Sequence, residues 1–418
     1  MTTATETVLA GLDDLRADLE DLYRHLHAHP ELSHAEHETA DLVADRLSDL
    51  GFEVHTGIGG TGVVGLLRNG EGPAVLLRAD MDALPVREET GLEHASRVTV
   101  SIDGTETPVM HACGHDVHVT SLVGAATLLA GARQAWRGTL VAIFQPAEEA
   151  GDGARTMVDD GLAELVGPVD VALAQHVLAF PSGQVRTRSG AVLSAADSLR
   201  ITVHGRGAHG SMPQAAVDPV VLAATIVIHL QTVVSREIAP TVPAVLTVGS
   251  IRAGSKSNVI GDHAVLEVNV RTYDEQTRAT VLAAIRRIVI AECQAAGSEK
   301  DPEFEPYDEF PPTVNDPDVT ERVVSAFADT FGDDAGELDL QSASEDFSDL
   351  PTALAIPYTY WGIGGIDPEQ YRTAEAAGRV SQDIPTNHSP HFAPVIQPTL
   401  DTGVRALVAA AMAWLARD

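Results

Sequence analysis

Residues 120–149 read TSLVGAATLLAGARQAWRGTLVAIFQPAEE and combine a helical segment, an apolar strand and a pair of glutamates. Their periodicity predicts a helix over residues 120–135 and a strand over residues 139–145. Further β-rich runs lie on either side of this stretch, at residues 62–67, 74–78 and 169–176. Strands that alternate with helices predict an α/β fold, with a mostly parallel sheet flanked by helices.

Polar residues follow three of these predicted strands. Asp80 comes after Leu76-Leu77, the pair Glu148-Glu149 comes after Ile143-Phe144, and His176 comes after Ala172-Leu173. In open parallel sheets, ligands bind outside the carboxyl ends of the strands. We therefore expect these side chains to meet at one edge of the sheet.

The pattern changes near residue 190. A βαββα order follows, with strands at 198–204, 244–252 and 263–273 and helices at 215–236 and 275–296. This order predicts a compact α+β domain with antiparallel pairing, inserted into the larger one. We expect residues 1–190 and 307–418 to form the catalytic domain, and residues 191–306 to form the insert. The proline- and acid-rich stretch around 301–314 is interpreted as the connector back, and the final helix as residues 398–417.

Composition excludes several classes of function. The formal net charge is −33, whereas binding nucleic acid requires clustered Lys and Arg. Apolar stretches such as residues 220–230 fall short of the roughly 20 residues of a membrane span. The N-terminus has no basic and apolar leader, so we expect a cytoplasmic protein. Only Cys113 and Cys293 are present, which excludes a disulfide scaffold.

Two short stretches suggest a metal site. Cys113 and His115 lie in one turn before a helix, and thiolate with imidazole suits a borderline-soft divalent ion. Alternatively, these residues are a helix N-terminus with incidental histidines. Glu148 and Glu149 are a solvated loop or the carboxylates of a metal hydrolase. In the second case one carboxylate binds the ion and its neighbour transfers the proton.

His176 and His388 complete the set. His176 is either a satisfied core residue or a ligand, and His388 lies in the predicted loop Asn387-His388-Ser389-Pro390. Each residue alone has a structural explanation. Their order and their placement after strands together favour a metal-dependent hydrolase site.

Seven sequence blocks resemble the aminoacylase and carboxypeptidase G-type family of dinuclear metallohydrolases. The resemblance covers almost the whole chain and is strongest to the amidohydrolase branch. That branch contains hippurate hydrolases, N-acyl-amino-acid amidohydrolases and hydrolases of auxin–amino acid conjugates. The blocks are LHAHPELS (26–33), RADMDALP (78–85), MHACGHD (110–116), QPAEE (145–149), GAHGS (207–211), NVIG (258–261) and NHSP (387–390).

The resemblance implies two divalent metal ions per subunit, Zn²⁺ or Mn²⁺, with Ni²⁺ and Co²⁺ as alternatives. It implies Glu148 as general base and acid. Other branches carry a ligating His where this chain has Arg78, so His115 is expected to supply that imidazole. Asp80 is expected to orient a metal-bound imidazole. The implied metal ligands are Cys113, His115, Glu149, His176 and His388.

The resemblance also assigns roles to the inserted domain. It implies that this domain pairs two subunits and that His209 stabilises the developing oxyanion across a homodimer. It implies that Asn258 and Arg271 approach the carboxylate or carbonyl of the substrate, since an Arg fork suits a carboxylate. The alternatives are a polar loop residue for His209 and a surface ion pair for Arg271.

The predicted reaction is therefore hydrolysis of an N-acyl-L-amino acid to a carboxylic acid and a free amino acid. One alternative is a dipeptidase or aminopeptidase of the same architecture. Another is a metal-dependent binding or regulatory protein without turnover. A serine hydrolase is disfavoured because no Gly-x-Ser-x-Gly elbow occurs. His118 is interpreted as packing or supporting, and His25, His27 and His29 as a structural helix end.

Overall fold

The structure is a computed structural model that describes residues 3–417. Contacts between residues divide the chain into two compact units. Unit 1 contains the chain up to Gly190, Asn315–Leu340 and the chain from Asp346 onward, and unit 2 contains Ala191–Val314 and Gln341–Glu345. The strand β9 (Gly190–Leu193) pairs with β16 (Thr313–Asn315) where the chain passes between the two units.

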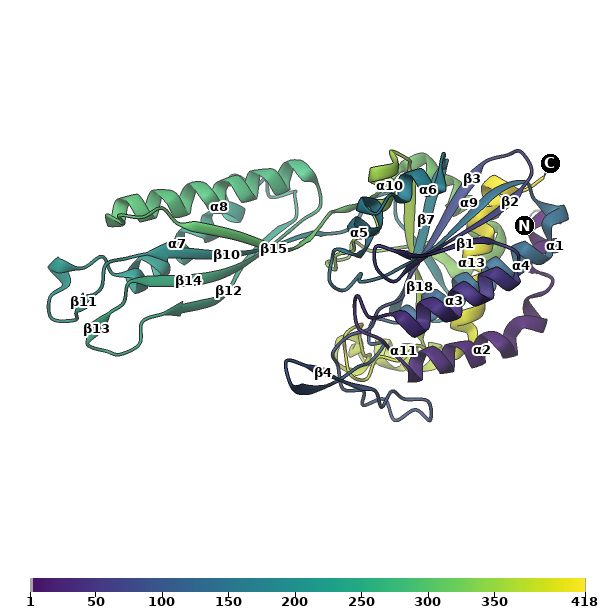
Figure 1. Ribbon diagram of the computed structural model, residues 1–418, viewed down its shortest axis with the longest axis horizontal. Helices are drawn as coiled ribbons and strands as arrows, with labels where there is room; N and C mark the ends of the chain where they lie inside the picture. Colours follow the sequence, from purple (N-terminus) through teal and green to yellow (C-terminus); the bar gives the residue numbers. More distant parts are fainter. Residues whose placement is uncertain (1–2, 418) are drawn as a thin grey trace. The chain divides into compact units, whose positions relative to one another are not determined.

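Unit 1 contains a central sheet, a short hairpin and most of the helices (Figure 1). Its strands are β1 (Glu53–Ile58), β2 (Gly62–Asn69), β3 (Ala74–Asp80), β4 (Thr99–Ile102), β5 (Thr105–Pro108), β6 (Gly138–Gln145), β7 (Val171–Pro181), β8 (Val185–Thr187), β17 (Ala335–Glu337) and β18 (Tyr358–Ile366). Its α-helices are α1 (Thr3–Leu9), α2 (Leu12–Ala28), α3 (His37–Asp49), α4 (His115–Gly131), α5 (Gly153–Asp159), α6 (Leu162–Val166), α9 (Pro317–Phe331), α10 (Asp349–Leu354), α11 (Pro368–Ala376), α12 (Val380–Asp383) and α13 (Ile396–Leu415).

The central sheet has eight strands in the order β1-β2-β6-β3-β7-β18-β8-β17. Four of its pairings are parallel and three, at β1-β2, β2-β6 and β18-β8, are antiparallel. The consecutive parallel strands β6, β3, β7 and β18 form the middle of the sheet. The predicted α/β fold with a mostly parallel sheet flanked by helices is therefore confirmed.

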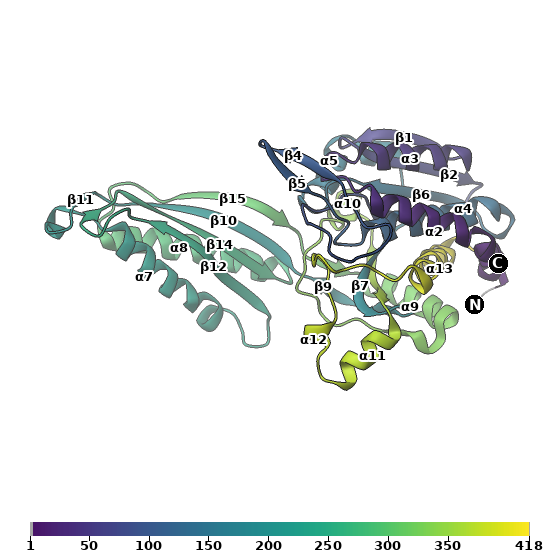
Figure 2. The same cartoon turned by 90° about the horizontal axis from the view of Figure 1, so that it is seen from below.

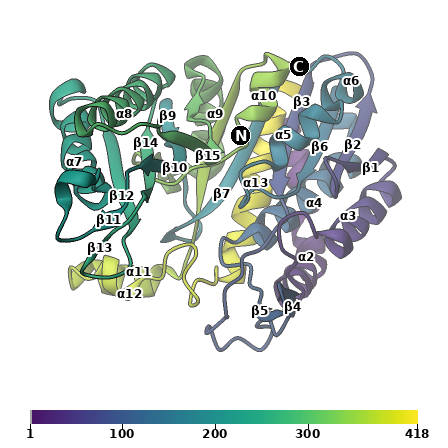
Figure 3. The same ribbon diagram turned by 60° about the vertical axis from the view of Figure 1, so that its left-hand side comes forward.

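Burial of the middle strands on both faces explains their apolar sequences. On β3, Val75, Leu77 and Ala79 belong to the core that also contains residues of α4 and α13. Successive side chains of a strand point to opposite faces, so Arg78 and Asp80 lie on the other face. Figure 3 shows α4 and α13 running along the sheet, and both contact β3 and β7.

The helix α4 is buried on almost every side, and its first residue is His115, one of the predicted ligands. Fourteen of its seventeen residues are buried, as expected for a helix that is apolar all round. It begins directly after Gly114, whose φ is +85°. A Cβ at Gly114 would lie 2.4 Å from Cγ1 of Val177. Glycine is therefore required there, and it sets the direction of Cys113 and His115 on either side.

Unit 2 is a four-stranded antiparallel sheet in the order β12-β14-β10-β15, with α7 and α8 packed together on one face (Figure 2). A two-stranded ribbon of β11 and β13 lies beside it. Its elements are β10 (Ala195–His204), β11 (Ala208–His209), α7 (Pro219–Thr232), the π-helical turn Val233–Glu237, β12 (Ala244–Ala253), β13 (Val259–Ile260), β14 (His263–Thr272), α8 (Glu275–Ala296) and β15 (Glu303–Phe310).

The interpretation of residues 301–314 as a connector was wrong. Most of this stretch is β15, which pairs antiparallel with β10, so the sheet order along the chain is βαββαβ rather than βαββα. Its acidic residues and Pro306 obscured the strand. Both features are tolerated because β15 lies at the edge of the sheet, where proline and charge discourage further pairing. The strand crosses residue 306, at which the sequence analysis ends the insert.

The apolar helix α7 is longer than the sequence stretch 220–230 indicated. Together with the following π-helical turn, Pro219–Glu237 is long and apolar enough to cross a membrane by composition, the one such helix within residues 3–417. Its buried residues, among them Leu222, Ile226 and Leu230, pack against the sheet of unit 2. Such packing is typical of a helix that covers a sheet. The opposite side of α7 exposes Val221 and Ile228, 61% and 73% accessible.

Candidate metal centre

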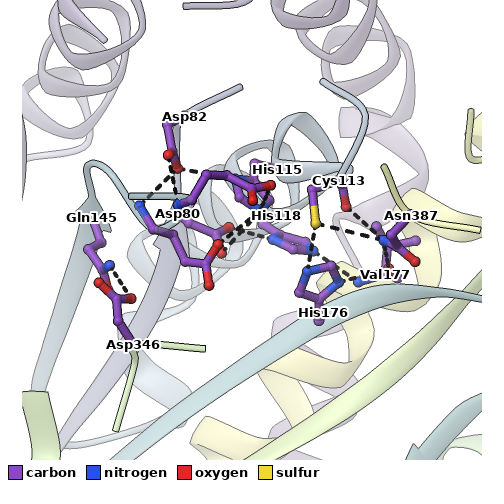
Figure 4. A network of polar contacts seen from close by, with 12 residues as sticks. Asp80, Asp82, Cys113, His115, His118, Gln145, His176, Val177, Asp346 and Asn387 are labelled. Atoms are coloured by element: carbon purple, nitrogen blue, oxygen red, sulfur yellow. Dashed lines mark hydrogen bonds and ion pairs between the residues drawn. The ribbon is translucent and has the colours of Figure 1, made fainter. Parts of the chain in front are cut away.

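The neighbouring strands β6, β3 and β7 bring the predicted site residues to one edge of the central sheet (Figure 4). Asp80 is the last residue of β3, and Glu148 and Glu149 follow the end of β6. His176 was predicted to end its strand. It does not, because β7 continues to Pro181. Its pairing with β3 covers only Val171–Ala174, and the rest of β7 pairs with β18. His176 therefore lies two residues beyond the last paired position, level with Asp80 at the end of β3.

The structure brings together all five predicted ligands and Glu148. We call this set the metal-site cluster: Cys113, His115, Glu148, Glu149, His176 and His388. Sγ of Cys113 lies 3.4 Å from Nε2 of His176. Oε1 of Glu149 lies 3.4 Å from Nε2 of His388 and 3.9 Å from Nε2 of His115. In each of the triads Cys113-His115-His176, Cys113-Glu149-His388 and His115-Glu148-Glu149, the donor atoms lie within 4.8 Å of one another.

Several donor atoms of this cluster are buried without a hydrogen-bond partner. Among residues 3–417, these include both ring nitrogens of His115 and Oε1 of Glu149. An unpartnered buried polar atom is costly, and native structures rarely keep one without a function. A thiol, three imidazoles and a carboxylate are the ligands that zinc and similar divalent ions take. The residues present therefore fit divalent metal ions.

The charges around the cluster shift its proton affinities. Burial opposes the positive form of His115, but the carboxylates of Asp80 and Asp82 raise the pKa of this imidazole to about 10. Burial lowers the pKa of His176, which keeps that ring neutral. Burial and the neighbouring Glu149 raise the pKa of the Cys113 thiol. The cluster thus concentrates negative charge at a dry position, which a cation would neutralise.

The loop with His388 is fastened to the turn with Cys113. The backbone N–H of His388 donates to the carbonyl of Ala112 at 2.8 Å. The side-chain amide of Asn387 donates to the carbonyls of Cys113 and Val177, both at 3.0 Å. These bonds connect segments that are 210 or more residues apart in the sequence. They hold His388 near the other ligands, although its side chain is 55% exposed.

The hydrogen bonds of Asp80 go to residues outside the predicted ligand set. It forms hydrogen bonds with Nδ1 of His118 and with Nη1 of Arg78, the latter at 2.7 Å. The fully buried Arg78 also donates to Gln145 at 2.8 Å and lies 3.3 Å from Asp346. Asp80 is 3.6 Å from Nε2 of His115, the nitrogen that faces Glu149. Its role as an orienter of a metal-bound imidazole stays a proposal.

Asp82 was not predicted as a site residue, yet it contacts more of the cluster than Asp80 does. Its Oδ1 lies 3.3 Å from Nδ1 of His115. Its two oxygens accept from the backbone N–H groups of Glu148 and Glu149 at 3.1 and 3.0 Å, and from the hydroxyl of Ser33 at 2.6 Å. The only sequence signal for this residue is its place two positions after Asp80. Carboxylates of this kind orient metal ligands.

A second buried cluster lies next to the first, and we call it the His27 cluster: His27, Glu88 and Asp116. Nδ1 of His27 contacts Asp116 at 2.6 Å and Nε2 contacts Glu88 at 3.1 Å. Burial opposes the charge of His27, but these two carboxylates raise the pKa of its ring to about 10. His27 is thus a buried cation between two anions. The interpretation of this helix end as structural agrees with that arrangement.

Unit 2 contains His209, predicted to stabilise the oxyanion, and the predicted substrate-binding residues Asn258 and Arg271. Of these three, His209 and Asn258 lie side by side. The strand pair places His209 opposite Val259, and the N–H of Gly210 donates to the carbonyl of Asn258 at 2.8 Å. His209 is exposed, and its Nδ1 lies 2.8 Å from the hydroxyl of Ser211. Arg271 lies apart from them near the end of β14, where its guanidinium donates to Asn269 and, at 2.6 Å, to Ser344.

Comparison with known proteins gives a consistent result. Residues 76–412 match the model of peptidase family M20/M25/M40. The chain is 38% identical over 346 residues to thermostable carboxypeptidase 1 of Saccharolobus solfataricus, which covers 82% of this chain and 84% of that protein. It is also 38% identical over 340 residues to the hippurate hydrolase of Campylobacter jejuni, with 80% and 85% covered.

A solved structure from Bacillus subtilis, described as a dinuclear metal binding peptidase from the M20 family, has the same architecture. Its TM-score is 0.77 at 27% identity, and the match covers 96% of this chain and 98% of that chain. The predicted resemblance to dinuclear metallohydrolases is thereby confirmed. The chain belongs to peptidase family M20/M25/M40 and is a metal-dependent amidohydrolase.

Proposed function

We propose that this protein hydrolyses the amide bond of N-acyl-L-amino acids, hippurate-like or auxin-conjugate-like, to a carboxylic acid and a free amino acid. The observation that carries the proposal is the pairing of Glu148 with Glu149 beside three imidazoles and a thiol. Adjacent carboxylates allow one to bind a cation while the other transfers protons. The hippurate hydrolase among the relatives supports an N-acyl amino acid as the substrate.

Two divalent ions would be held by Cys113, His115, Glu149, His176 and His388. When bound, such ions lower the pKa of water and stabilise negative charge on an amide oxygen. Zn²⁺ and Mn²⁺ are the proposed ions, with Ni²⁺ and Co²⁺ as alternatives. The Cys113 thiolate favours the softer ions of this group, because sulfur is a soft ligand.

Glu148 is the proposed general base and general acid. Its Oε2 lies 3.9 Å from Nε2 of His115, so its carboxylate faces the proposed ligands. It would accept a proton from the attacking water and deliver that proton to the departing nitrogen. Asp82 fixes the backbone at Glu148 and Glu149 through two hydrogen bonds. One turn, fixed by Asp82, thus carries both the proposed base Glu148 and the proposed ligand Glu149.

Unit 2 is proposed to supply the remaining contacts. His209 would stabilise the oxyanion, and Asn258 and Arg271 would bind the carboxylate or carbonyl of the substrate. A homodimer through unit 2 is supported by apolar side chains that the described structure leaves exposed. They lie on α7 and on the edge strand β12 and in β13: Val220, Val221, Ile228, Val245, Ile251 and Val259. The cytoplasmic location stays a prediction.

A peptidase of the same architecture is the second candidate. It is favoured by the relative named thermostable carboxypeptidase 1. The two activities differ in what lies on the acyl side of the scissile bond, a simple acid or an amino acid with a free amine. A panel of N-benzoyl, N-acetyl and indole-acetyl amino acids beside dipeptides separates them. Much faster cleavage of dipeptides would contradict the N-acyl amino acid proposal.

The role of Glu148 is tested with Glu148→Gln. We expect hydrolysis to fall by about 10²–10⁴-fold, the usual contribution of a general acid–base residue. Bound metal should persist, because the proposed ligands are intact. Elemental analysis of the purified variant beside the amine-release assay gives both readouts. Unchanged turnover would contradict the assigned base, and loss of metal would make Glu148 a ligand instead.

A further inference from the structure

The turn that carries the proposed base has an unusual backbone conformation. Residues 146–149 follow β6, and Ala147 has a φ of +50°. Positive φ is uncommon in residues other than glycine, and it persists only where the surroundings enforce it. The direction of Glu148 depends on this conformation, since Glu148 is the next residue.

Three successive backbone N–H groups of the turn donate to buried carboxylates from elsewhere in the chain. The N–H groups of Glu148 and Glu149 donate to Asp82. The N–H of Ala147 donates to Oε1 of Glu36 at 2.8 Å, across 111 residues of sequence. Each N–H of the strained turn is thus fixed by a specific acceptor, and Glu36 fixes the one at the positive φ.

Glu36 is itself held rigidly. Its side chain is completely buried. Its Oε2 accepts from the hydroxyl of Thr61 at 2.6 Å, and its Oε1 also accepts from the N–H of His34 at 3.0 Å. Gly153 approaches the turn so closely that a Cβ there would lie 1.7 Å from the carbonyl oxygen of Pro146. The turn is therefore packed against both a buried carboxylate and a glycine.

Glu36 occupies the position before α3, but its side chain does not cap that helix. The free N–H groups of Glu38 and Thr39 are instead satisfied by Glu31, at 2.9 and 2.8 Å. A residue at this position would ordinarily satisfy the helix N-terminus. Because Glu31 does so, the carboxylate of Glu36 is available for the turn. Glu31 thus caps α3, while Glu36 binds the turn that carries Glu148.

We propose that Glu36 is a positioning residue of the reaction, which fixes the backbone of the Glu148 turn so that the Glu148 carboxylate meets both the water and the departing nitrogen. This inference rests on the proposed role of Glu148. The hydrogen bonds of Glu36 go to His34, Thr61 and Ala147 and to none of the proposed metal ligands, whereas Asp82 contacts His115. Substitution of Glu36 therefore separates positioning of the base from metal binding.

The test compares Glu36→Ala, Glu36→Gln and the matched control Glu31→Ala with an N-benzoyl amino acid as substrate. We expect Glu36→Ala to lower kcat by about 10–100-fold, because misplacement of a reacting group by about 1 Å has effects of this size. KM should stay within about 3-fold and metal content should stay unchanged. Glu36→Gln should recover most of kcat, since its amide oxygen still accepts from Ala147 and its NH₂ can donate to Thr61.

Glu31→Ala should lower stability through loss of the helix cap but leave kcat near that of the wild type. If Glu36→Ala does not fold, Thr61→Val serves in its place, because it removes one bond that holds Glu36. The expected loss in kcat for Thr61→Val is about 3–10-fold, again with KM and metal content unchanged.

Three results would overturn the inference: a kcat within about 3-fold of the wild type in both Glu36→Ala and Thr61→Val, a loss of metal in step with activity, or a Glu36→Gln variant as impaired as Glu36→Ala. Wild-type protein and Glu148→Gln are run in the same assay. An inactive wild type or an active Glu148→Gln variant contradicts the proposed function instead. The two failures are thus distinguishable.

Discussion

Consecutive residues of α4, His115 and Asp116, belong to two buried clusters that differ in how their polar atoms are satisfied. In the His27 cluster, the imidazole of His27 uses both ring nitrogens, one on Asp116 and one on Glu88. In the metal-site cluster, His115 leaves both ring nitrogens, and Glu149 leaves Oε1, without a hydrogen bond. Both clusters place an imidazole among carboxylates, but only His27 has a hydrogen bond on each ring nitrogen.

The comparison shows what distinguishes a structural cluster from a functional one in this fold. The buried His27 is bonded to two carboxylates, and its removal would leave both of them buried without a cation. Buried donor atoms that converge without partners are costly unless a ligand completes them. We therefore expect substitutions in the first cluster to change stability, and substitutions in the second to change metal binding and activity.

The largest expected effect is on activity, from His115→Ala. This change removes a proposed ligand, so kcat/KM should fall by more than about 100-fold, since even residues that only support a ligand contribute 10–100-fold. Metal content should fall with it. Steady-state kinetics and elemental analysis give both values. Wild-type activity and full metal content in this variant would remove His115 from the site.

The matching change in the other cluster is His27→Leu. It leaves Asp116 and Glu88 buried without a cation, so the free energy of unfolding should fall by about 3–5 kcal/mol. Urea denaturation with metal removed by chelation measures this. The exposed His25→Leu, on the same helix, is the control and should stay within about 0.5 kcal/mol of the wild type. The folded fraction of His27→Leu should keep its kcat. A stable but inactive variant would break the comparison.

Asp82→Asn tests whether a carboxylate that is not itself a proposed ligand supports the metal-site cluster. Asp82 accepts N–H groups on both oxygens, so an amide must point its NH₂ at one of those donors. We expect a loss of about 10–100-fold in activity or metal affinity, as for other carboxylates that support ligands. Metal titration and kinetics measure it, with the exposed Asp103→Asn as control. Equal activity of the two variants would show that Asp82 does not position the turn.

The smallest effect per step of the measurement is a pH dependence of the His27 cluster. The pKa of His27 is raised to about 10 in the folded protein, above the value near 6.5 of an unfolded chain. Its stabilisation is therefore complete below about pH 6.5 and declines as the pH rises toward 10, by at most about 1.4 kcal/mol per pH unit. The stability difference between wild type and His27→Leu, measured from pH 6 to 10, should shrink accordingly. A constant difference would contradict a charged His27.

The sequence predicted those parts of the fold and site that depend on local pattern. The apolar runs of β3 and β6 identified the parallel sheet, and the polar residues that follow them gave its functional edge. Several strands escaped, and two of them show why. β15 is an acidic edge strand with a proline, and β18 contains three glycines although it lies in the middle of the sheet. Both are stabilised by pairing with distant strands, which local propensity does not reveal.

The supporting residues of the site escaped for a related reason. Asp80 and Asp82 differ by two positions in one motif, and only the folded chain shows that Asp82 reaches the Glu148 turn. Glu36 lies 111 residues from the N–H that it accepts. The sequence contains the residue types, but the direction of a side chain is set by its surroundings. The choice among carboxylates therefore required the three-dimensional structure.

Metal titration of the metal-free protein is the most direct test of the difference between the two clusters. Wild type and His27→Leu should each bind two equivalents of Zn²⁺ or Mn²⁺, measured by calorimetry and confirmed by elemental analysis. Variants of Cys113, His115, Glu149, His176 or His388 should bind fewer than two equivalents or bind them more weakly. Two tightly bound equivalents in all of these variants, or none in the wild type, would contradict the assignment of the metal-site cluster.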